Sequence, residues 1–526
     1  MAILSQDGNM NIASAIGIGL VTILVGLHYS SGIKVHPKEP RVIRPWVPVI
    51  GHLLGMALSG GRYVKRLGLY HADPIFTLPV PGSRLYIVKD PALAATVQRT
   101  SKTLSFSPLI ADIIARVLGL DAETIDVVRK NLDPEPGAPR GLLADVHDNV
   151  YTLLGPGAYL NELSVDAVRE LGAQLHAYNT TNGDTSSQPK THDLLLWIRH
   201  FVTFGTADYL FGPNNPLSHD PHLEEAFWAF DHGLGGLLMG VFPSVTASKA
   251  YNGREKMVAA FLKYYQNGHI SEASKVIQDR HRIERSYNMS DDMVSRSALS
   301  FLFAGVVNTT TTTFWVVLRL FADPELLTLV RSEVDATFAK SKELHGDDHL
   351  SIGLIQDGCP TLVAVYRECL RLGSENFSVR LVKEDVMLND QYYLKKGGVV
   401  QIAGGAMHLD KTIWGDDVAE FNHRRFLGIS KSNGSNFHPA AFRSFGGGKT
   451  LCPGRHFATN EILCFAALIV KSYDLASPGG NKLEVPEKND LVMPVHILEP
   501  RLSDCPTVKI SSRPEAEQLG RLQVVT

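Results

Sequence analysis

The sequence predicts a mainly α protein with small β-sheets, and three patterns indicate it. Beyond residue 90 the distribution of apolar residues is mainly helical. Before that point, two short runs of β-forming residues at 75–78 and 85–88 flank a Pro-Gly-Ser turn, which predicts a hairpin. At the start of the chain, residues 12–27 are uncharged and mostly apolar, which predicts a single transmembrane helix preceding the folded domain.

The composition bounds the class of protein. The chain has 526 residues, of which 44% are hydrophobic and 20% are charged, so it can bury a large core. Its formal net charge of -3 provides no broad basic surface, and we therefore expect no nucleic-acid partner. The five cysteines are odd in number, scattered and free of C-x-x-C pairs, which argues against a disulfide framework and against a zinc or iron–sulfur site. A reducing compartment fits this pattern.

The apolar stretch at 12–27 is shorter than the roughly 20 residues of an ideal membrane span, but the two residues after it can extend it into the interface. A cleaved signal peptide is the alternative. Against it, no Lys or Arg precedes the stretch, whereas three basic residues follow within 34–41. By the positive-inside rule, this basic flank leaves the rest of the chain in the cytosol. The sequence therefore predicts a single-pass anchor over residues 1–30.

Three further segments are predicted to lack regular structure. Four prolines between residues 37 and 48 predict a stiff, extended segment over residues 31–52, for which an ordinary linker is the alternative. Residues 179–190 are polar and rich in Gly, Ser and Thr, and residues 211–221 hold three prolines and one glycine. We therefore expect loops at both places.

Residues 290–322 form one very long helical candidate. Ser290 can cap its start, and two aspartates follow in the first turn. At 1.5 Å per residue such a helix would reach roughly 50 Å, enough to cross the whole domain. Five consecutive threonines at 309–313 have poor helix propensity. Tertiary burial must therefore hold them helical, or the helix is distorted there.

The most informative motif surrounds Cys452. Phe445, Gly448, Cys452 and Gly454 form the pattern F-x-x-G-x-x-x-C-x-G, in which a turn of glycines presents one cysteine before a Pro-Gly pair that can open a helix. Pro453 suits the first turn of that helix, whose positive end and backbone N–H groups would stabilise a thiolate. This geometry suits a thiolate bound to an iron whose opposite face stays open. A buried structural cysteine beside a glycine loop is the alternative.

On this motif, continued by Arg455 and Phe457, the chain resembles the cytochrome P450 family, the haem-thiolate monooxygenases. The resemblance implies one large, mostly helical catalytic domain with the P450 fold over residues 53–526, with residues 31–52 as the family's proline-rich hinge. A thiolate ligand pushes electron density onto the haem iron and favours O–O cleavage. The implied cofactor is haem b (iron protoporphyrin IX), with Cys452 as its axial metal ligand and with Phe445, Gly448 and Gly454 as further cofactor-binding residues.

Glu368 and Arg371 form an E-x-x-R pattern, a spacing that puts both side chains on one helix face. By itself this pattern is common, and a solvated helix pair is the alternative. Arg425 stands where the family has a third partner, although His423 replaces the proline that the family usually has nearby. The resemblance implies a structural triad of Glu368, Arg371 and Arg425, which braces the haem-binding core and does no chemistry.

Arg380 follows the E-x-x-R helix. By position it resembles an arginine of the family that pairs with a haem propionate, and a guanidinium fork suits a carboxylate. A surface strand residue is the alternative. Most family members have a second basic residue for a propionate two positions before the cysteine, where this chain has Thr450. The sequence therefore leaves the second propionate without an assigned partner.

The oxygen-binding groove of the family reads [A/G]-G-x-[D/E]-[T/S], and residues 304–308 match only its beginning. Val307 replaces the acid and Asn308 replaces the alcohol, so Val307 cannot help to deliver protons. Gly305 is expected to let the helix open over the haem, where a Cβ would crowd bound oxygen. Asn308 can donate one hydrogen bond and accept another, and can hold a water. Gly305 and Asn308 are the residues expected to shape the catalytic site.

Asn308, the Phe314-Trp315 pair and Thr450 are similar to one branch of the family, which holds cholesterol 7α-hydroxylase, sterol 12α-hydroxylase and prostacyclin synthase. The resemblance implies a monooxygenase that inserts one oxygen atom from O2 into a lipophilic substrate, such as a sterol, a terpenoid or another secondary metabolite. Because the branch also contains an isomerase, a haem-thiolate isomerase or dehydratase that needs no reductase is one alternative. A non-catalytic haem-binding protein is another. Candidate pocket residues, each of which could equally be plain core, are Phe301, Phe303, Ala304, Phe377, Val379, Ile497 and Leu498.

The resemblance also implies partners and a location. NADPH would supply electrons through an NADPH–cytochrome P450 reductase, with cytochrome b5 as a second candidate donor. Arg443, Lys449 and Arg455, if exposed, would form a basic patch that attracts such an acidic donor, whereas ordinary loop charges without a partner are the alternative. The usual place of the family's anchor predicts a single-pass protein of the endoplasmic reticulum membrane whose catalytic domain faces the cytosol.

Overall fold

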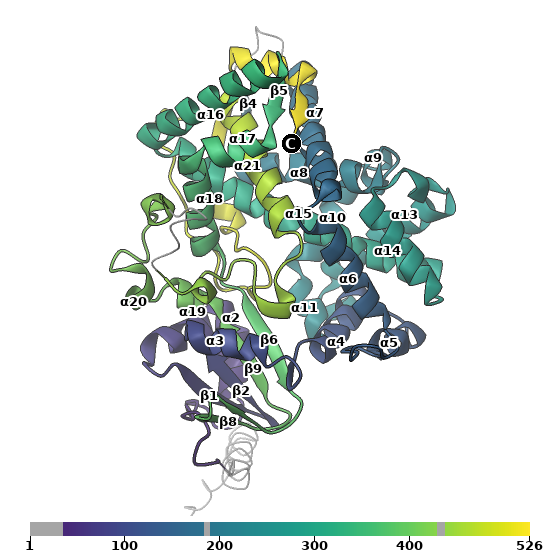
Figure 1. The fold of residues 1–526 in the computed structure, drawn as a ribbon, viewed down its shortest axis with the longest axis vertical. Coiled ribbons are helices and arrows are strands. Elements are labelled where there is room, and N and C mark those ends of the chain that lie inside the picture. Colours follow the sequence, from purple (N-terminus) through teal and green to yellow (C-terminus); the bar gives the residue numbers. More distant parts are fainter. Residues whose placement is uncertain (1–34, 183–189, 429–436) are drawn as a thin grey trace, which may run out of the picture.

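The computed structural model describes residues 35–182, 190–428 and 437–526. Helices make up most of the molecule, and a five-stranded sheet lies at one end beside α2 (Gly51–Tyr70) and α3 (Pro91–Arg99) (Figure 1). This is the mainly α architecture with small sheets that the sequence predicts. The predicted membrane anchor at residues 1–30 lies outside the described residues.

The five-stranded sheet has the order β1-β2-β9-β6-β3. The predicted hairpin is present, because β1 and β2 pair antiparallel around a turn in which Gly82 adopts a φ of 72°. Both faces of the sheet are buried, since Ile75 packs in one apolar cluster with Leu93 of α3 while Phe76 packs in another with Val64 of α2. The strands are β1 (Ile75–Val80), β2 (Ser83–Val88), β3 (Leu104–Ser105), β6 (Phe377–Val382) and β9 (Val399–Ala403).

Three smaller sheets join segments that are far apart in the sequence. One has three strands in the order β10-β11-β4, and the other two each have a single strand pair. The strands are β4 (Lys190–Asp193), β10 (Tyr473–Ala476) and β11 (Thr507–Ser512), β5 (His349–Ser351) with β12 (Gln523–Val525), and β7 (Val386–Leu388) with β8 (Tyr392–Leu394).

The remaining helices enclose one large apolar core. In chain order they are α4 (Ser107–Leu118), α5 (Ala122–Arg129), α6 (Leu142–Leu154), α7 (Ala158–Asn182), α8 (Leu194–Phe211), α9 (Pro216–His219), α10 (Leu223–His232), α11 (Leu234–Met239), α12 (Pro243–Thr246), α13 (Ser248–Gln266), α14 (Lys275–Ser286), α15 (Asp291–Phe321), α16 (Pro324–His345), α17 (Ile352–Gly358), α18 (Pro360–Gly373), α19 (Gly404–His408), α20 (Lys411–Trp414) and α21 (Arg455–Ser472). Short 3-10 turns lie at His269–Glu272, His423–Phe426, Pro439–Ala441, Gly448–Thr450, Leu502–Asp504 and Pro514–Arg521.

Helix α15 is the predicted long helix, and it lies near the centre of the molecule (Figure 1). The Ser290 hydroxyl accepts a hydrogen bond from the Met293 N–H at 3.3 Å, as expected for a cap. The five threonines at 309–313 are helical and no more than 4% exposed, so burial overrides their poor propensity. Among the described helices α15 alone is apolar and long enough to span a membrane, yet 72% of its most apolar window is buried, which identifies it as a core helix.

Two predicted loops are only partly correct. Helix α7 continues to Asn182, which takes in the first part of the loop expected at 179–190, and Lys190 already begins β4. Residues 183–189 lie outside the described part of the chain. In the segment 211–221, Asn215 caps a short helix through bonds from the N–H groups of the second and third residues after it, so a polar, proline-rich stretch forms the turn α9.

The proline-rich segment is attached to the sheet over its described part. The Ile43 N–H donates to the Thr77 carbonyl at 2.9 Å, and the Thr77 hydroxyl donates to the Pro40 carbonyl at 2.9 Å. Helix α2 begins at Gly51, so the last two residues of the expected hinge are helical.

Candidate active site

The loop that carries Cys452 is closed by one backbone bond and shaped by glycines. The Cys452 N–H donates to the Phe445 carbonyl at 2.9 Å. Gly446 and Gly448 adopt φ values of 73° and 61°, which lie in the left-handed region that favours glycine. A Cβ on Gly448 would also lie 2.8 Å from the Gln98 Cβ, so the loop passes close against α3.

Helix α21 starts immediately after this loop. It begins at Arg455, with Gly454 before it, so Pro453 lies two residues ahead of the helix and not in its first turn as expected. Burial raises the pKa of the Cys452 thiol, while the backbone N–H groups of Gly454 and Arg455 and the Arg455 charge act in the opposite direction. Burial is the largest of these effects, and the hydrogen bonds that the sulfur accepts at the start of the helix partly offset it.

The other core cysteines have different surroundings. Cys359, Cys369 and Cys464 are buried in the main apolar core. Burial raises the pKa of Cys359 to about 11 and that of Cys369 to about 12, and it raises the pKa of Cys464 further. These three thiols behave as small apolar side chains.

The expected triad is assembled in the core. Arg371 and Glu368 are both fully buried and form a bidentate ion pair, with the Nε–Oε2 and Nη2–Oε1 distances both 2.7 Å. The Arg425 Nε lies 3.3 Å from Glu368 Oε1. The alternative of a solvated helix pair is therefore wrong. Arg371 also donates to the carbonyls of His408 and Val418, so the pair joins α18 to the segments that precede the cysteine loop.

One face of α15 remains accessible although most of the helix is buried. Ala304 and Asn308, one helical turn apart, are exposed, and Phe301 on the same face is half-buried. The Asn308 Oδ1 accepts a hydrogen bond from the Ile497 N–H at 2.9 Å. Because its oxygen is occupied, Asn308 offers its NH2 group as a donor on this face. Val307 is fully buried, so it faces the core.

Gly305 lies at the edge of this face, toward α8. A Cβ at Gly305 would lie 2.9 Å from the Thr206 Cγ2 and 3.5 Å from the Leu210 Cδ1, and both residues belong to α8. The expected role of Gly305 in clearing space for bound oxygen stays a prediction, and these contacts favour a role in helix packing. Its missing side chain allows α15 and α8 to pack closely.

Two arginines beside the cysteine loop are buried. Arg380 on β6 donates to the Thr450 hydroxyl at 2.7 Å, and burial lowers its pKa to about 10. The surface-residue alternative for Arg380 is therefore wrong. Arg443 is only 2% exposed and donates to the Ser378 hydroxyl at 3.3 Å. Arg443 therefore cannot belong to the exposed basic patch expected from the sequence. Of the other two residues of that patch, Lys449 is exposed and Arg455 is half-buried.

These residues fit one kind of cofactor. A thiol with helix N–H groups against it suits a metal ligand. The buried guanidiniums of Arg380 and Arg443 have no carboxylate within 4.0 Å among the described residues, so they suit the two propionates of a porphyrin. The loop and these two arginines are what we expect of a haem-thiolate protein.

Comparisons with known proteins agree. Residues 246–498 match the family model Cytochrome P450. The chain is 29% identical over 475 residues to the cytochrome P450 monooxygenase nodJ of Hypoxylon pulicicidum, a match that covers 88% of each chain. It is 29% identical over 467 residues to cytochrome P450 7A1 of Sus scrofa, covering 83% of this chain and 87% of that protein. The solved structure of retinoic-acid-bound cyanobacterial CYP120A1 shares the fold, with a TM-score of 0.67, 19% identity and coverage of 90% and 99%.

The chain is therefore similar to the cytochrome P450 family over residues 246–498, and among the relatives it resembles are cytochromes P450 7A1 and 7B1. Relatives named cytochrome P450 monooxygenases support a P450 monooxygenase enzyme, and this resemblance implies a haem with cysteine-thiolate ligation.

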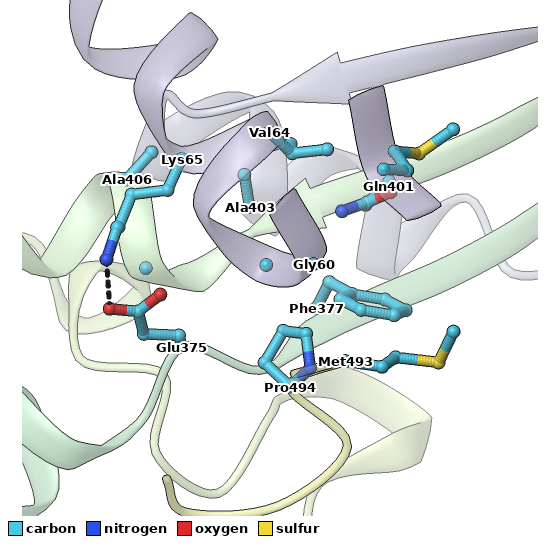
Figure 2. Close-up of a pocket in the computed structure, with 13 residues that line it drawn as sticks. Gly60, Val64, Lys65, Glu375, Phe377, Gln401, Ala403, Ala406, Met493 and Pro494 are labelled. Carbon is cyan, nitrogen blue, oxygen red and sulfur yellow. Dashed lines mark hydrogen bonds and ion pairs between the residues drawn. The ribbon is translucent and has the colours of Figure 1, made fainter. Parts of the chain in front are cut away.

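A cavity of about 100 Å³ lies away from the cysteine loop, between α2, β6, β9 and the loop of residues 491–499. Figure 2 shows Phe377 and Met493 on one side of it and the ion pair of Lys65 with Glu375, whose Nζ–Oε1 distance is 2.5 Å, on the other. Gly60 forms part of its wall with a φ of 51°, and a Cβ there would lie 2.2 Å from the Leu491 carbonyl oxygen. Neither Cys452 nor Asn308 lines this cavity.

Sequence reasoning missed two buried polar groups near Asn308. Burial raises the pKa of Glu461 to about 8, and its carboxyl oxygens lie 3.0 Å from the Tyr209 hydroxyl and 3.3 Å from the Thr309 hydroxyl. The sequence does single out Glu461, because it is the one acidic residue inside the apolar run that follows Gly454.

The second missed group is an ion pair that holds the loop of residues 491–499. The His496 Nε2 lies 3.3 Å from the Asp231 Oδ1. Burial acts to lower the pKa of His496, but the Asp231 carboxylate outweighs it and raises that pKa to about 9. No sequence pattern joins these residues, because α10 and the loop are 265 positions apart (496 minus 231).

Proposed function

We propose that Cys452 is the axial thiolate ligand of haem b in a monooxygenase that inserts one oxygen atom from O2 into a C–H bond of a lipophilic substrate. The observation that carries this proposal is the glycine loop that sets the Cys452 sulfur against the first N–H groups of α21. When bound, the thiolate-ligated haem supplies dioxygen activation.

The residues around the cysteine hold and shield the cofactor. Gly448 lets the loop pass close to α3, and Gly454 precedes the first residue of α21. Phe445 fixes the loop through its carbonyl and packs its ring against the main core. The buried Arg380 guanidinium would bind a propionate of the haem.

On the accessible face of α15, Asn308 would act as a polar group beside a bound substrate. Its NH2 group donates to a water or to a substrate oxygen, while its Oδ1 stays with the Ile497 N–H. The half-buried Phe301 and the small Ala304 give the rest of this face an apolar character that suits a lipophilic substrate. Leu498 is fully buried and forms part of the core.

A sterol, a terpenoid or another secondary metabolite is the substrate class we propose. The relatives of known name include a cholesterol 7-alpha-monooxygenase of Cricetulus griseus, which is 28% identical over 263 residues.

We further propose a membrane location and a redox partner. Residues 1–30 would anchor the protein in the endoplasmic reticulum membrane, residues 31–52 would orient it, and residues 53–526 would form the catalytic domain in the cytosol. Exposed apolar side chains such as Leu58 and Phe242, which are 80% and 78% exposed, support contact with a membrane. An NADPH–cytochrome P450 reductase, or cytochrome b5 for one electron, would dock beside the exposed Lys449.

The test is the variant Cys452→Ala. We expect it to lose the carbon monoxide difference band typical of thiolate-ligated haem, and a retained band would refute the ligand assignment. Cys464→Ala is the matched control, because Cys464 lies in the apolar core, and it should keep the band.

Turnover of a candidate substrate by microsomes should need NADPH, O2 and the reductase. Product formed without NADPH and O2 would instead support the isomerase or dehydratase alternative. A substrate-induced spin shift without any product would support a non-catalytic haem-binding protein.

A further inference from the structure

Five arginines are buried in the described part of the chain, and two of them lack a negative partner. Arg371, Arg199 and Arg254 each form an ion pair with a glutamate, at distances of 2.7, 2.6 and 2.8 Å respectively. Arg380 and Arg443 form none with any described carboxylate, although they are only 4% and 2% exposed. Burying a charge without a partner is strongly unfavourable. The pattern therefore indicates that an anion binds beside these two side chains.

The polar contacts of the two arginines are all neutral. Arg443 donates from Nη2 to the Ser378 hydroxyl at 3.3 Å, and Arg380 donates to the Thr450 hydroxyl and to the Val379 carbonyl, both at 2.7 Å. Burial lowers the pKa of Arg443 to about 10, and the charge of Arg380 adds to this effect. The two cations therefore lie close enough to repel each other, and a ligand with two negative charges would relieve both.

The position of the pair points to the ligand. Arg443 lies two residues before Phe445, and Arg380 contacts Thr450, which lies two residues before Cys452. A Cβ at Gly446 would lie 3.0 Å from the Thr450 carbonyl oxygen and 4.0 Å from the Ser378 hydroxyl oxygen, so both arginine contacts meet at the same turn of the cysteine loop. Two carboxylates at one edge of a porphyrin would fit this arrangement.

We infer that Arg443 binds a haem propionate and supplies the cation that Thr450 cannot provide. The inference rests on the proposed function, since it requires a haem at Cys452. Arg443 would then be the binding partner of the second haem propionate, although the sequence pattern suggested that Arg443 belongs to an exposed basic patch. Arg443 approaches from the segment before the loop, whereas Arg380 approaches from β6.

The variant Arg443→Met tests this inference on the full-length holoprotein. We expect haem to transfer to excess apomyoglobin about tenfold faster or more, because one charge-assisted contact is lost. The unfolding midpoint of the haem-free protein should stay the same or rise, because an unpaired buried charge is removed. A merely structural arginine would show the opposite pattern, with the haem-free protein destabilised and the transfer rate unchanged, and that result would overturn the inference.

Two further variants make the test specific. Arg254→Met, which breaks a buried arginine–glutamate pair elsewhere, should destabilise the haem-free protein without selective haem loss. Thr450→Arg in the Arg443→Met background places a cation two residues before the cysteine and should restore slow haem transfer. If Arg443→Met alone does not accumulate, recovery of folded holoprotein by Thr450→Arg supports the inference, and failure to recover it refutes it.

The role of Arg443 and the proposed haem ligand can fail independently in these experiments. If Cys452→Ala keeps a thiolate-type spectrum, the haem assignment itself fails. If the haem assignment stands and Arg443→Met holds haem as tightly as the unchanged protein, only the role of Arg443 is wrong.

Discussion

Gly305→Ala tests whether Gly305 serves helix packing or leaves space for a ligand. The added Cβ would lie 2.9 Å from the Thr206 Cγ2, which is too close for an ordinary contact. Overpacking of this kind costs about 1–3 kcal/mol, whereas replacing glycine by alanine inside a helix gains about 1 kcal/mol. We therefore expect a net destabilisation of about 0–2 kcal/mol. Thr206→Ser removes the contacting methyl, so in the double variant the penalty should disappear and the two substitutions should be non-additive by about 1–3 kcal/mol.

The assay combines unfolding of the holoprotein with imidazole binding to the haem iron. If Gly305 faces α8, Gly305→Ala should change the unfolding free energy and leave the imidazole dissociation constant within about twofold. Ala304→Leu is the matched control, because Ala304 is exposed on the accessible face, and it should weaken imidazole binding with little loss of stability. Loss of imidazole binding by Gly305→Ala without any change in stability would refute the reasoning and restore the role that the sequence suggested.

Three further predictions concern buried titratable side chains. Glu368→Gln leaves the fully buried Arg371 without its counter-charge and should cost about 3–5 kcal/mol, so the variant should fail to accumulate as holoprotein; normal accumulation would show that the pair is dispensable. The pKa of His496 is raised by Asp231 to about 9, so its stabilisation is complete below the unfolded value of 6.5 and is lost as the pH rises through 9. The fall in thermal midpoint over that range should be smaller in His496→Gln, and equal slopes would contradict the assignment. Burial raises the pKa of Glu461 to about 8 from its ordinary value of 4.5. The folded state therefore retains a proton that the unfolded state loses above pH 4.5, and stability should decline from there to pH 8. Glu461→Gln should flatten that decline, and an unchanged profile would exclude a protonated carboxyl.

The sequence predicted those features that depend on short spacings. Glu368 and Arg371 are three residues apart on one helix, so their contact follows from helix geometry alone. The glycine loop before Cys452 is likewise local, since its conformation depends on which residues tolerate a positive φ. The threonine run at 309–313 was ambiguous in the sequence, because propensity and burial act in opposite directions there and only packing decides between them.

Features that depend on a distant neighbour could not be predicted. Whether the missing side chain of Gly305 faces a ligand or another helix depends on where α8 packs, about 100 residues earlier in the chain (305 minus 206 is 99). Arg443 lies in an irregular segment, so no periodicity indicated whether its side chain is buried. Charge alone suggested an exposed patch, and the structure places this charge inside the protein, where its function must differ.

The orientation of Asn308 follows from a chain of contacts that starts outside α15. Its Oδ1 is directed by the Ile497 N–H, and the position of that N–H depends on the loop of residues 491–499. Two bonds fix this loop at Leu498, since its N–H donates to the Gly373 carbonyl at 3.0 Å and its carbonyl accepts from the Trp315 Nε1 at 2.9 Å. If the loop moved away, the Asn308 amide could turn over and present an acceptor in place of a donor. The polarity that a substrate meets at this face is therefore controlled by the loop as well as by α15 itself.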